Sequence, residues 1–352
     1  MKILNQDPRN KIYFIRANKT KFGGAEVYLS RLSDALDKQN IRHEIVNSIF
    51  PKFLPSWLRA ILFNLQAYLT KKNKFYFSLD RITCPDVYRA GDGVHKVFLT
   101  IEKKSKLNPL HPIYLFLEKK CFGNAKKIIA ISNMVKQNII DSYGVDREKI
   151  RVVYNGIELK KYNTNNSFSI LASEFFIKPN QKILLYVGSG FKRKGVEEFL
   201  QIVSMLKETN IKVFIVGKDK NIKYYQQLSK DLDLDKKVIF TGPREDVENF
   251  YAISDIFLFP THYEPFGSVI LEAMNFRNAV ITTKQCGGSE ILDDEFIMND
   301  PQDFSIVQKI DALLSDKDRL KIIQESNREL SKKFSIEKNL SETLKVINEV
   351  IN

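Results

Sequence analysis

Long hydrophobic runs, a signal-peptide core and a cysteine framework are all missing from this 352-residue sequence. No stretch of about 18 uncharged apolar residues occurs, so no membrane-spanning helix is expected. Residues 1–20 contain no apolar core of signal-peptide length, which predicts a cytoplasmic location. The three cysteines are odd in number, far apart and not joined by any metal-ligand spacing, so they are interpreted as reduced thiols. They are Cys84, Cys121 and Cys286.

The length and composition indicate a globular protein of two domains. A chain of this length is too long for one ordinary core and fits two domains of about 150 to 180 residues. Hydrophobic residues make up 43% of it, enough to fill both cores. We predict an N-terminal domain over 1–165, a C-terminal domain over 166–335 and a C-terminal helix over 336–352. The helical pattern alone allows the helix to pack on either domain, and our hypothesis is that it returns to the N-terminal one.

The net charge of +13 is unevenly distributed. Residues 1–165 hold 30 of the 55 Lys and Arg residues and 14 of the 42 Asp and Glu residues, a net charge of +16, and the remainder carries −3. A basic half joined to a slightly acidic half suggests an anionic partner for the first half. Nucleic acid, an anionic membrane surface and a phosphorylated glycan are all candidates for this partner. The alternative explanation of the positive charge is a lysine-rich proteome with a solvated surface.

The hydrophobic pattern predicts an α/β fold with doubly wound sheets. Short runs rich in Val, Ile and Phe alternate with helical patterns, which is typical of parallel strands buried on both faces. The expected strands cover 11–16, 42–47, 75–79, 126–132, 150–156, 182–189, 212–217, 237–242, 256–260 and 279–283. A polar stretch at 160–169 is interpreted as a linker between two domains that enclose a cleft. Ligands of such sheets bind outside the carboxyl ends of the strands.

Two glutamates eight positions apart flank a turn in HYEPFGSVILEA, residues 262–273. The turn follows an expected strand, and Gly267 and Ser268 begin an apolar helix. A helix N-terminus offers unpaired N–H groups and a partial positive charge, which suit a phosphate. Glu264 precedes the helix and Glu272 lies more than a turn inside it. The pair therefore suits a sugar nucleotide, a ligand with hydroxyls at both ends and phosphate in the middle. The alternative is that Glu264 is a surface-loop residue and Glu272 a solvated residue of the helix.

Two other glycine-containing loops follow expected strands. In VGSGFKRKGVEEF (187–199), Gly188 ends a strand and Lys192, Arg193 and Lys194 precede the next helix, an arrangement that suits a diphosphate. It matches neither the dinucleotide fingerprint nor a P-loop. In KFGGAEVYLSRL (21–32), Gly23 and Gly24 lead into an amphipathic helix and let the backbone approach a ligand. The alternative for the first loop is an exposed basic turn, and the alternative for the second is a plain tight turn.

With these motifs in this order, most of the chain resembles the retaining, sugar-nucleotide-dependent glycosyltransferases of GT-B fold that carry two glutamates separated by seven residues. The matching pieces are GGAE, IAISNMVKQNI with VVYNGIE, VGSGFKRKG, FTGPREDV and YEPFGSVILEAM with GGSEIL. The lipopolysaccharide core glycosyltransferases are the most similar group. The resemblance implies a GT-B fold of two Rossmann-like domains, with the acceptor bound by the first domain and the nucleotide sugar by the second.

The resemblance also implies roles for individual residues. Glu264 would hold hydroxyls of the donor sugar, the amides near Phe266, Gly267 and Ser268 would meet the sugar and diphosphate, and Glu272 would bind the ribose. Arg193 and Lys194 would neutralise the leaving diphosphate in place of a metal ion. Gly23, Gly24 and Gly188 would approach the donor, and the GPRED segment with Gly242 and Arg244 would help to select the base. We therefore expect no cofactor and no metal, and interpret the Asp-x-Asp pairs at 230–237 as structural.

Two segments of the first domain bear on the acceptor. In DVYRAGDGVHKVFL (86–99), Asp92 and His95 are both candidates to contact the acceptor hydroxyl, and a core histidine is the alternative for His95. Retention of the anomeric configuration suggests front-face attack, in which the leaving phosphate takes the proton of the acceptor hydroxyl. Residues 50–74 combine Phe, Leu and the single Trp with flanking cations and no acid, as interfacial helices do. Peripheral contact with the inner membrane is therefore a hypothesis, with ordinary helix packing as the alternative.

The predicted function is hexose transfer from a nucleotide-diphosphate sugar to a glycan. UDP as the nucleotide and the lipopolysaccharide or lipooligosaccharide core as the acceptor are expected from the resemblance alone. Capsule or protein glycosylation is the next candidate for the pathway. A sugar-nucleotide epimerase of the same fold is one rival. A basic nucleic-acid-binding protein is another, although no recognised nucleic-acid motif occurs and no nucleic-acid partner is expected.

Overall fold

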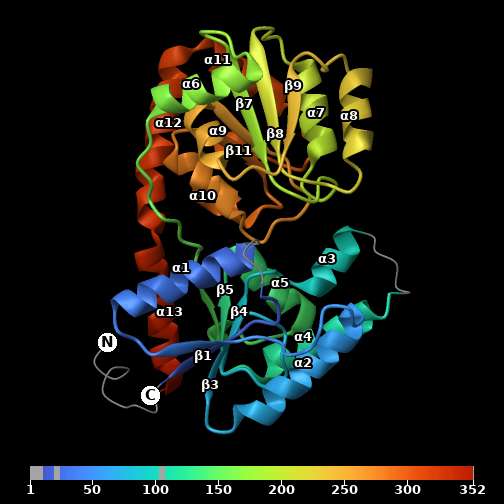
Figure 1. The fold of residues 1–352 in the computed structure, drawn as a ribbon, viewed down its shortest axis with the longest axis vertical. Coiled ribbons are helices and arrows are strands. Elements are labelled where there is room, and N and C mark those ends of the chain that lie inside the picture. Colours follow the sequence, from blue (N-terminus) through green and yellow to red (C-terminus); the bar gives the residue numbers. More distant parts are fainter. Residues whose placement is uncertain (1–10, 20–23, 103–107, 352) are drawn as a thin grey trace. The chain divides into compact units, whose positions relative to one another are not determined.

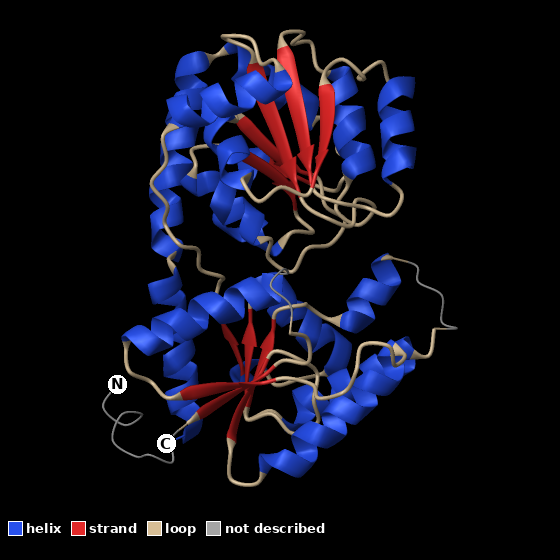
Figure 2. Cartoon of the chain, in the orientation of Figure 1, coloured by secondary structure: helices blue, strands red, loops and turns tan. Residues whose placement is uncertain are grey.

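The computed structural model describes residues 11–19, 24–102 and 108–351, and it forms two compact units (Figure 1). The N-terminal unit comprises Met1–Gly156 and Ile336–Asn352, and the C-terminal unit comprises Ile157–Ser335. Each unit contains a six-stranded sheet covered by helices (Figure 2), and all of the strand pairs in the described residues are parallel. The predicted α/β class is confirmed.

The sheet of the N-terminal unit has the strand order β2-β1-β3-β4-β5-β6. Its strands are β1 Ile12–Ile15, β2 His43–Val46, β3 Phe75–Ser78, β4 Val87–Ala90, β5 Lys127–Ala130 and β6 Ile150–Val152. Its helices are α1 Gly24–Lys38, α2 Ser56–Lys71, α3 His95–Ile101, α4 Leu110–Asn124, α5 Asn133–Tyr143 and α13 Ile336–Ile351, with a 3-10 turn η1 at Arg147–Lys149. All four residues of the central strand β4 are buried, including Arg89, and this strand was not among those expected from the sequence.

The C-terminal helix α13 packs on the N-terminal unit. Its apolar residues Leu340, Leu344 and Ile347 recur every three to four positions and so form one face of the helix. That face is buried in a core shared with Leu32 and Leu36 of α1. The C-terminal segment therefore completes the core of the first unit.

The sheet of the C-terminal unit has the order β12-β11-β10-β7-β8-β9. Its strands are β7 Lys182–Val187, β8 Ile211–Val216, β9 Val238–Gly242, β10 Ile256–Phe259, β11 Ala279–Thr283 and β12 Ile297–Met298. Its helices are α6 Thr164–Phe175, α7 Val196–Met205, α8 Ile222–Asp231, α9 Val247–Ile253, α10 Ser268–Asn275, α11 Ile306–Ser315 and α12 Lys317–Ser331, with 3-10 turns η2 Gly287–Ile291, η3 Asp294–Phe296 and η4 Lys332–Phe334.

The stretch 160–169, predicted as a linker, contains the beginning of helix α6. Asn163 caps this helix, because its side-chain oxygen accepts a hydrogen bond from the Asn166 N–H at 3.2 Å. Ser167 on the next turn donates to the Asn249 side chain at 2.9 Å. The polar residues that suggested a loop thus begin a helix of the C-terminal unit, and the structure divides the chain at 156/157 rather than at 165/166.

The order of strands in each sheet defines where a ligand is expected. Chain order reverses direction beside β7 in the C-terminal unit, since β8 lies on one side of it and β10 on the other. In the N-terminal unit the same reversal occurs beside β1, which lies between β2 and β3. Ligands of open α/β sheets bind at such points, outside the carboxyl ends of the strands.

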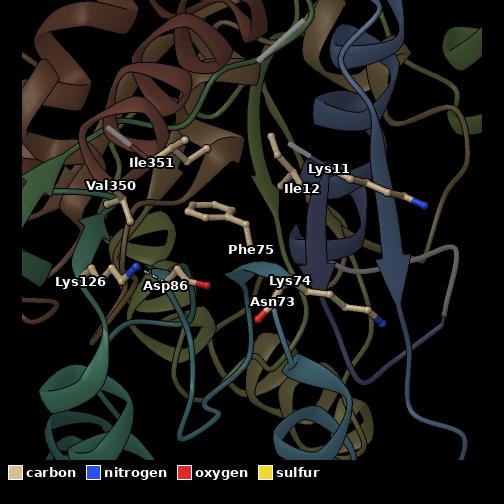
Figure 3. A pocket seen from close by; sticks show the side chains of 9 residues that line it. All are labelled: Lys11, Ile12, Asn73, Lys74, Phe75, Asp86, Lys126, Val350 and Ile351. Carbon is tan, nitrogen blue, oxygen red and sulfur yellow. Dashed lines mark ion pairs between the residues drawn. The ribbon is translucent and has the colours of Figure 1, made fainter. Parts of the chain in front are cut away.

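A pocket of about 240 Å³ lies at the opposite edge of the N-terminal sheet (Figure 3). Its lining comes from the beginnings of β1 and β3 and from the end of α13. Asp86, which precedes β4, lies in it and is paired with Lys126 at 3.3 Å and with Lys71. The pocket is therefore at the amino ends of the strands, away from the edge at which a ligand is expected.

Candidate active site

Two loops meet at the carboxyl edge of the C-terminal sheet, where β7 and β10 are neighbours. Gly195 allows their close approach: its φ is +75°, and a Cβ atom there would lie 1.8 Å from the Pro260 carbonyl oxygen. The Arg193 carbonyl accepts hydrogen bonds from the Thr261 hydroxyl at 3.1 Å and the His262 N–H at 2.9 Å. The loop after β7 is thus fixed against the loop after β10.

These loops bring two cations onto one carboxylate. Glu264 Oε2 lies 3.1 Å from Arg193 Nη1 and 3.2 Å from Lys194 Nζ. The Arg193 guanidinium also donates to the Tyr263 carbonyl. All three charged side chains are mostly buried, whereas Lys192 is exposed. The cluster Arg193–Glu264–Lys194, called the cation–carboxylate cluster below, contains two of the three cations singled out in the sequence.

Glu264 is held ionised by its neighbours. Burial on its own would raise the pKa of this carboxyl, but Lys194 and Arg193 outweigh it and keep the pKa below the usual value for glutamate. The cluster therefore carries one negative and two positive charges, and its net positive charge suits a phosphate ligand.

The loop of Glu264 is also joined to the loop after β11. The Glu264 N–H donates to the Gln285 carbonyl at 3.0 Å, and the Glu264 carbonyl accepts from the Gly287 N–H at 2.9 Å. Gly267 has φ of +79°, and a Cβ atom there would lie 3.2 Å from Glu264 Cγ and 3.3 Å from Cys286 Sγ. This residue makes the turn into α10, whose first helical residue is Ser268.

Apart from Gly23 and Gly24, the remaining predicted donor residues lie on the same unit. Phe266 is fully buried, and its carbonyl accepts a hydrogen bond from the Cys286 thiol at 3.2 Å. Glu272 lies on α10, where the Tyr251 hydroxyl donates to it at 3.4 Å. Gly188 follows β7, and Gly242 ends β9 with φ of +74°. The predicted residues of this unit therefore lie along the carboxyl edge of its sheet, in the loops after β7, β9 and β10 and on α10.

The Arg244 guanidinium is held by two carboxylates that are not among the predicted donor residues. Its Nη1 and Nη2 bind the two carboxylate oxygens of Glu174 at 2.7 and 2.8 Å, and its Nε binds Asp246 at 2.7 Å. The arrangement ties helix α6 to the loop after β9. A contact from this side chain to a nucleotide would require the fork to Glu174 to open.

A second charged cluster lies at the carboxyl ends of β1 and β3 in the N-terminal unit. Arg16 follows β1 directly, and its guanidinium binds Glu26 at 2.8 Å and Asp80 at 2.9 Å. Glu26 belongs to the predicted GGAE loop. Gly24 of that loop is the first residue of α1, and Gly23 lies outside the described residues.

Asp92 extends this cluster toward solvent. Its carboxylate lies 3.9 Å from Arg16 and 4.0 Å from Arg81, and half of its side chain is exposed. Arg81 also donates to the Gly93 carbonyl at 3.1 Å and to Glu118 at 2.8 Å. The loop that carries Asp92 is thus fixed by residues from elsewhere in the unit.

His95 is part of the protein interior. Its ring packs against Phe98 and Tyr114, and its Nε2 lies 3.2 Å from Nδ1 of His111. Its backbone N–H donates to the fully buried Glu118 at 2.7 Å. Burial, assisted by Arg81, lowers the pKa of His95 to about 4, so the ring is neutral at neutral pH.

The lowered pKa predicts an acid-sensitive contribution to stability. Between about pH 6.5 and pH 4 the unfolded chain holds a proton on His95 that the folded chain lacks, so acidification favours unfolding. Between pH 7 and pH 5 the wild type should lose up to about 2 kcal/mol more unfolding free energy than His95→Asn. Urea titrations at both pH values measure the difference, and parallel losses would show that His95 titrates normally.

The sequence reasoning missed Arg16, Asp80, Arg81 and Glu118. The first three directly follow strands or lie within three residues of a strand end, and that position is the signal that could have identified them. Glu118 has no such signal, because it lies in the middle of α4. Across 11–19, 24–102 and 108–351, no group of three or more His, Cys, Asp or Glu side chains is arranged to hold a metal ion.

Comparison with known proteins gives matches over both units. Residues 169–330 match the family described as "Glycosyl transferases group 1", and residues 91–161 match "Glycosyltransferase Family 4". The lipopolysaccharide glucosyltransferase WaaG of Escherichia coli K12 is 31% identical over 219 residues, 59% of this chain and 58% of WaaG. The capsular polysaccharide biosynthesis glycosyltransferase CapM of Staphylococcus aureus is 30% identical over 237 residues, 63% of this chain and 61% of CapM. The matches therefore span about three fifths of the length of these relatives.

Solved structures share the fold over nearly the whole chain. The crystal structure of WaaG, a glycosyltransferase involved in lipopolysaccharide biosynthesis, has a TM-score of 0.81 at 21% identity and covers 96% of this chain and 99% of that one. Anabaena Alr3699/HepE in complex with UDP-glucose has a TM-score of 0.74 at 20% identity and covers 96% and 99%. The predicted GT-B fold is confirmed by this likeness.

Proposed function

Because residues 169–330 match the group 1 glycosyltransferases, we propose that the chain transfers a hexose from a nucleotide-diphosphate sugar to a glycan and retains the anomeric configuration. The observation that carries the proposal is the cation–carboxylate cluster at the switch point of the C-terminal sheet. It combines a carboxylate for sugar hydroxyls with two cations for a diphosphate, at the edge where such sheets bind ligands.

The donor is proposed to lie along the loops after β7 and β10. Glu264 binds hydroxyls of the sugar, the amides from Phe266 to Ser268 meet the sugar and diphosphate, and Glu272 binds the ribose. Lys194 and Arg193 are already fixed beside the place where charge develops, so they need little reorganisation to stabilise it. We therefore propose a metal-independent reaction, in which these two residues supply the positive charge.

The reaction exchanges one bond at the anomeric carbon for another on the same face. The bond from that carbon to the phosphate oxygen breaks, and the electron pair leaves with the diphosphate. The acceptor hydroxyl oxygen forms the new bond, and its proton passes to the departing phosphate oxygen. The two cations stabilise the charge on the leaving diphosphate during this step.

Asp92 is proposed to orient the acceptor hydroxyl. Its side chain is half exposed and held near Arg16 and Arg81, whereas His95 is buried among rings. This difference in exposure favours Asp92 over His95, the other candidate from the sequence. Full transfer activity of Asp92→Asn on a core oligosaccharide would contradict the assignment.

We infer UDP as the nucleotide and a lipopolysaccharide or lipooligosaccharide core as the acceptor. The support is the similarity to WaaG, a lipopolysaccharide glucosyltransferase, and to HepE, which was solved with UDP-glucose. The similarity to CapM keeps a capsular glycan as the next candidate. A cytoplasmic location with peripheral contact to the inner membrane is part of the same proposal.

A thermal-shift panel tests donor binding. UDP, GDP, ADP and CMP are added with a chelator to the wild type and to Glu272→Ala. A nucleotide at about 100 times its dissociation constant adds roughly 2.7 kcal/mol, which raises the melting temperature by a few degrees. We expect UDP to give this shift and Glu272→Ala to lose it.

The matched control is Glu329→Ala, because Glu329 also lies on a helix of the C-terminal unit and is exposed in an ion pair with Lys332. It should keep the shift. Absence of a shift with all four nucleotides would contradict the proposed function, and a shift that appears only with added magnesium would contradict metal independence.

A further inference from the structure

Helix α2 presents apolar side chains to solvent. Ile61, Leu65, Tyr68 and Leu69 are 41%, 48%, 64% and 65% exposed, and Phe53 in the preceding turn is 85% exposed. We call these five residues the α2 stripe. Isolated apolar residues on a surface are ordinary, but five within 17 positions of one segment form a patch that favours a partner.

The stripe is a regular face of the helix. Ile61, Leu65, Tyr68 and Leu69 follow one another at intervals of four, three and one, so they lie along one side. The inner side of the helix carries Phe63 and Ala67, which are buried in a core with Ile15, Tyr76 and Ile82. The helix is therefore anchored in the unit by one apolar side and exposes a second.

The charged residues of the segment that carries the stripe all have one sign. No acid occurs between Glu44 and Asp80, and the five bases in that interval are Lys52, Arg59, Lys71, Lys72 and Lys74. Arg59 and Lys71 are bonded to Asn18 and Asp86 within the unit. Lys52 and Lys72 are exposed at the two ends of the stripe. An apolar face with cations at its ends is complementary to an anionic lipid surface.

We propose that the α2 stripe binds the interfacial region of an anionic bilayer, with Lys52 and Lys72 at the level of the headgroups. The helix has 16 residues, too few to span a bilayer, and none of the helices in the described part of the chain is long and apolar enough to do so. The stripe therefore lies on the membrane surface. The inference rests on the proposed function only in that an acceptor linked to lipid gives the contact a purpose.

Vesicle sedimentation of the full chain tests the proposal. The lipids are phosphatidylcholine alone and an equal mixture with phosphatidylglycerol. The wild type should bind the anionic vesicles, and raised salt should weaken that binding because it screens the lysines. The triple variant Leu65→Ser, Tyr68→Ser, Leu69→Ser should bind them at least about tenfold more weakly, since it removes apolar contact area.

The matched control removes three exposed apolar side chains of the C-terminal unit. Phe176, Met205 and Ile322 are 84%, 49% and 69% exposed, and their triple serine variant should bind vesicles as the wild type does. Because the changed α2 side chains are exposed, the stripe variant should keep its nucleotide thermal shift. That shift separates failure of membrane binding from failure of the proposed donor site.

Three results would overturn the proposal. The wild type would show no binding to anionic vesicles, or the stripe variant would bind as well as the wild type, or both triple variants would lose binding equally. Sedimentation velocity without lipid tests whether a second copy of the chain, rather than a membrane, covers the stripe. A dimer that the stripe variant abolishes would show that it does.

Discussion

Lys194→Ala is expected to slow cleavage of the sugar–phosphate bond about 10²- to 10³-fold, the loss typical when one preorganised donor to a developing negative charge is removed. Lys194 is mostly buried, and its ammonium group lies 3.2 Å from Glu264 beside the proposed diphosphate position. Because the charge on the leaving group grows during the reaction, the turnover number should fall more than the affinity for the donor. Release of UDP from UDP-sugar, with water as the acceptor, measures the rate.

Lys192→Ala is the matched control for this variant. Lys192 has the same charge and lies two residues away in the same loop, but its side chain is exposed and is not paired with Glu264 in the structure. Its rate should stay within about threefold of the wild type, since an exposed charge contributes little. Equal losses in the two variants would show that the loop supplies general positive charge rather than a fixed cation.

Glu264→Gln should abolish most sugar release while changing the affinity for UDP far less. The substitution keeps the shape of the side chain and removes its charge. A hydrogen bond to a charged group is worth about 1.5–3 kcal/mol, and the carboxylate also positions Arg193 and Lys194, so we expect a loss of about 10²-fold or more. The rate assay and titration calorimetry with UDP measure the two effects separately.

The contrast with Glu272→Ala makes the prediction specific. Glu272 is proposed to hold the ribose, so its variant should lose affinity for UDP, whereas Glu264→Gln should lose sugar chemistry. Glu325→Gln is a control, because Glu325 forms a partly exposed ion pair with Arg277 at 2.9 Å on the same unit. Loss of UDP binding in Glu264→Gln would contradict the assignment of Glu264 to the sugar.

The loops of the C-terminal unit show why much of this site could be predicted. Strands buried on both faces give uninterrupted apolar runs, and parallel strands place the residues that follow them at one edge of the sheet. Glu264, Gly188 and the Lys192–Lys194 run could be placed there from chain order alone. The sequence could not tell which of those cations meets Glu264, because that depends on how Gly195 fits against Pro260.

The N-terminal unit was harder to predict because its site is built from distant parts of the chain. Arg16 reaches Asp80, 64 positions away, and Glu118 holds Arg81 and the His95 N–H from another helix. Such pairs are set by tertiary packing and leave no local spacing. The segment 160–169 shows the opposite error, since Asn and Ser favour loops but also cap helices, as Asn163 does.

The most direct test of the central proposal is proton NMR of the first sugar released from UDP-glucose, recorded before the anomers interconvert. UDP-glucose carries an α-linked sugar, so front-face chemistry supported by Arg193 and Lys194 predicts that α-glucose is formed first. Lys194→Ala should release it far more slowly. First formation of β-glucose would contradict the retaining mechanism, and an equal rate in Lys194→Ala would contradict the role of the cation–carboxylate cluster.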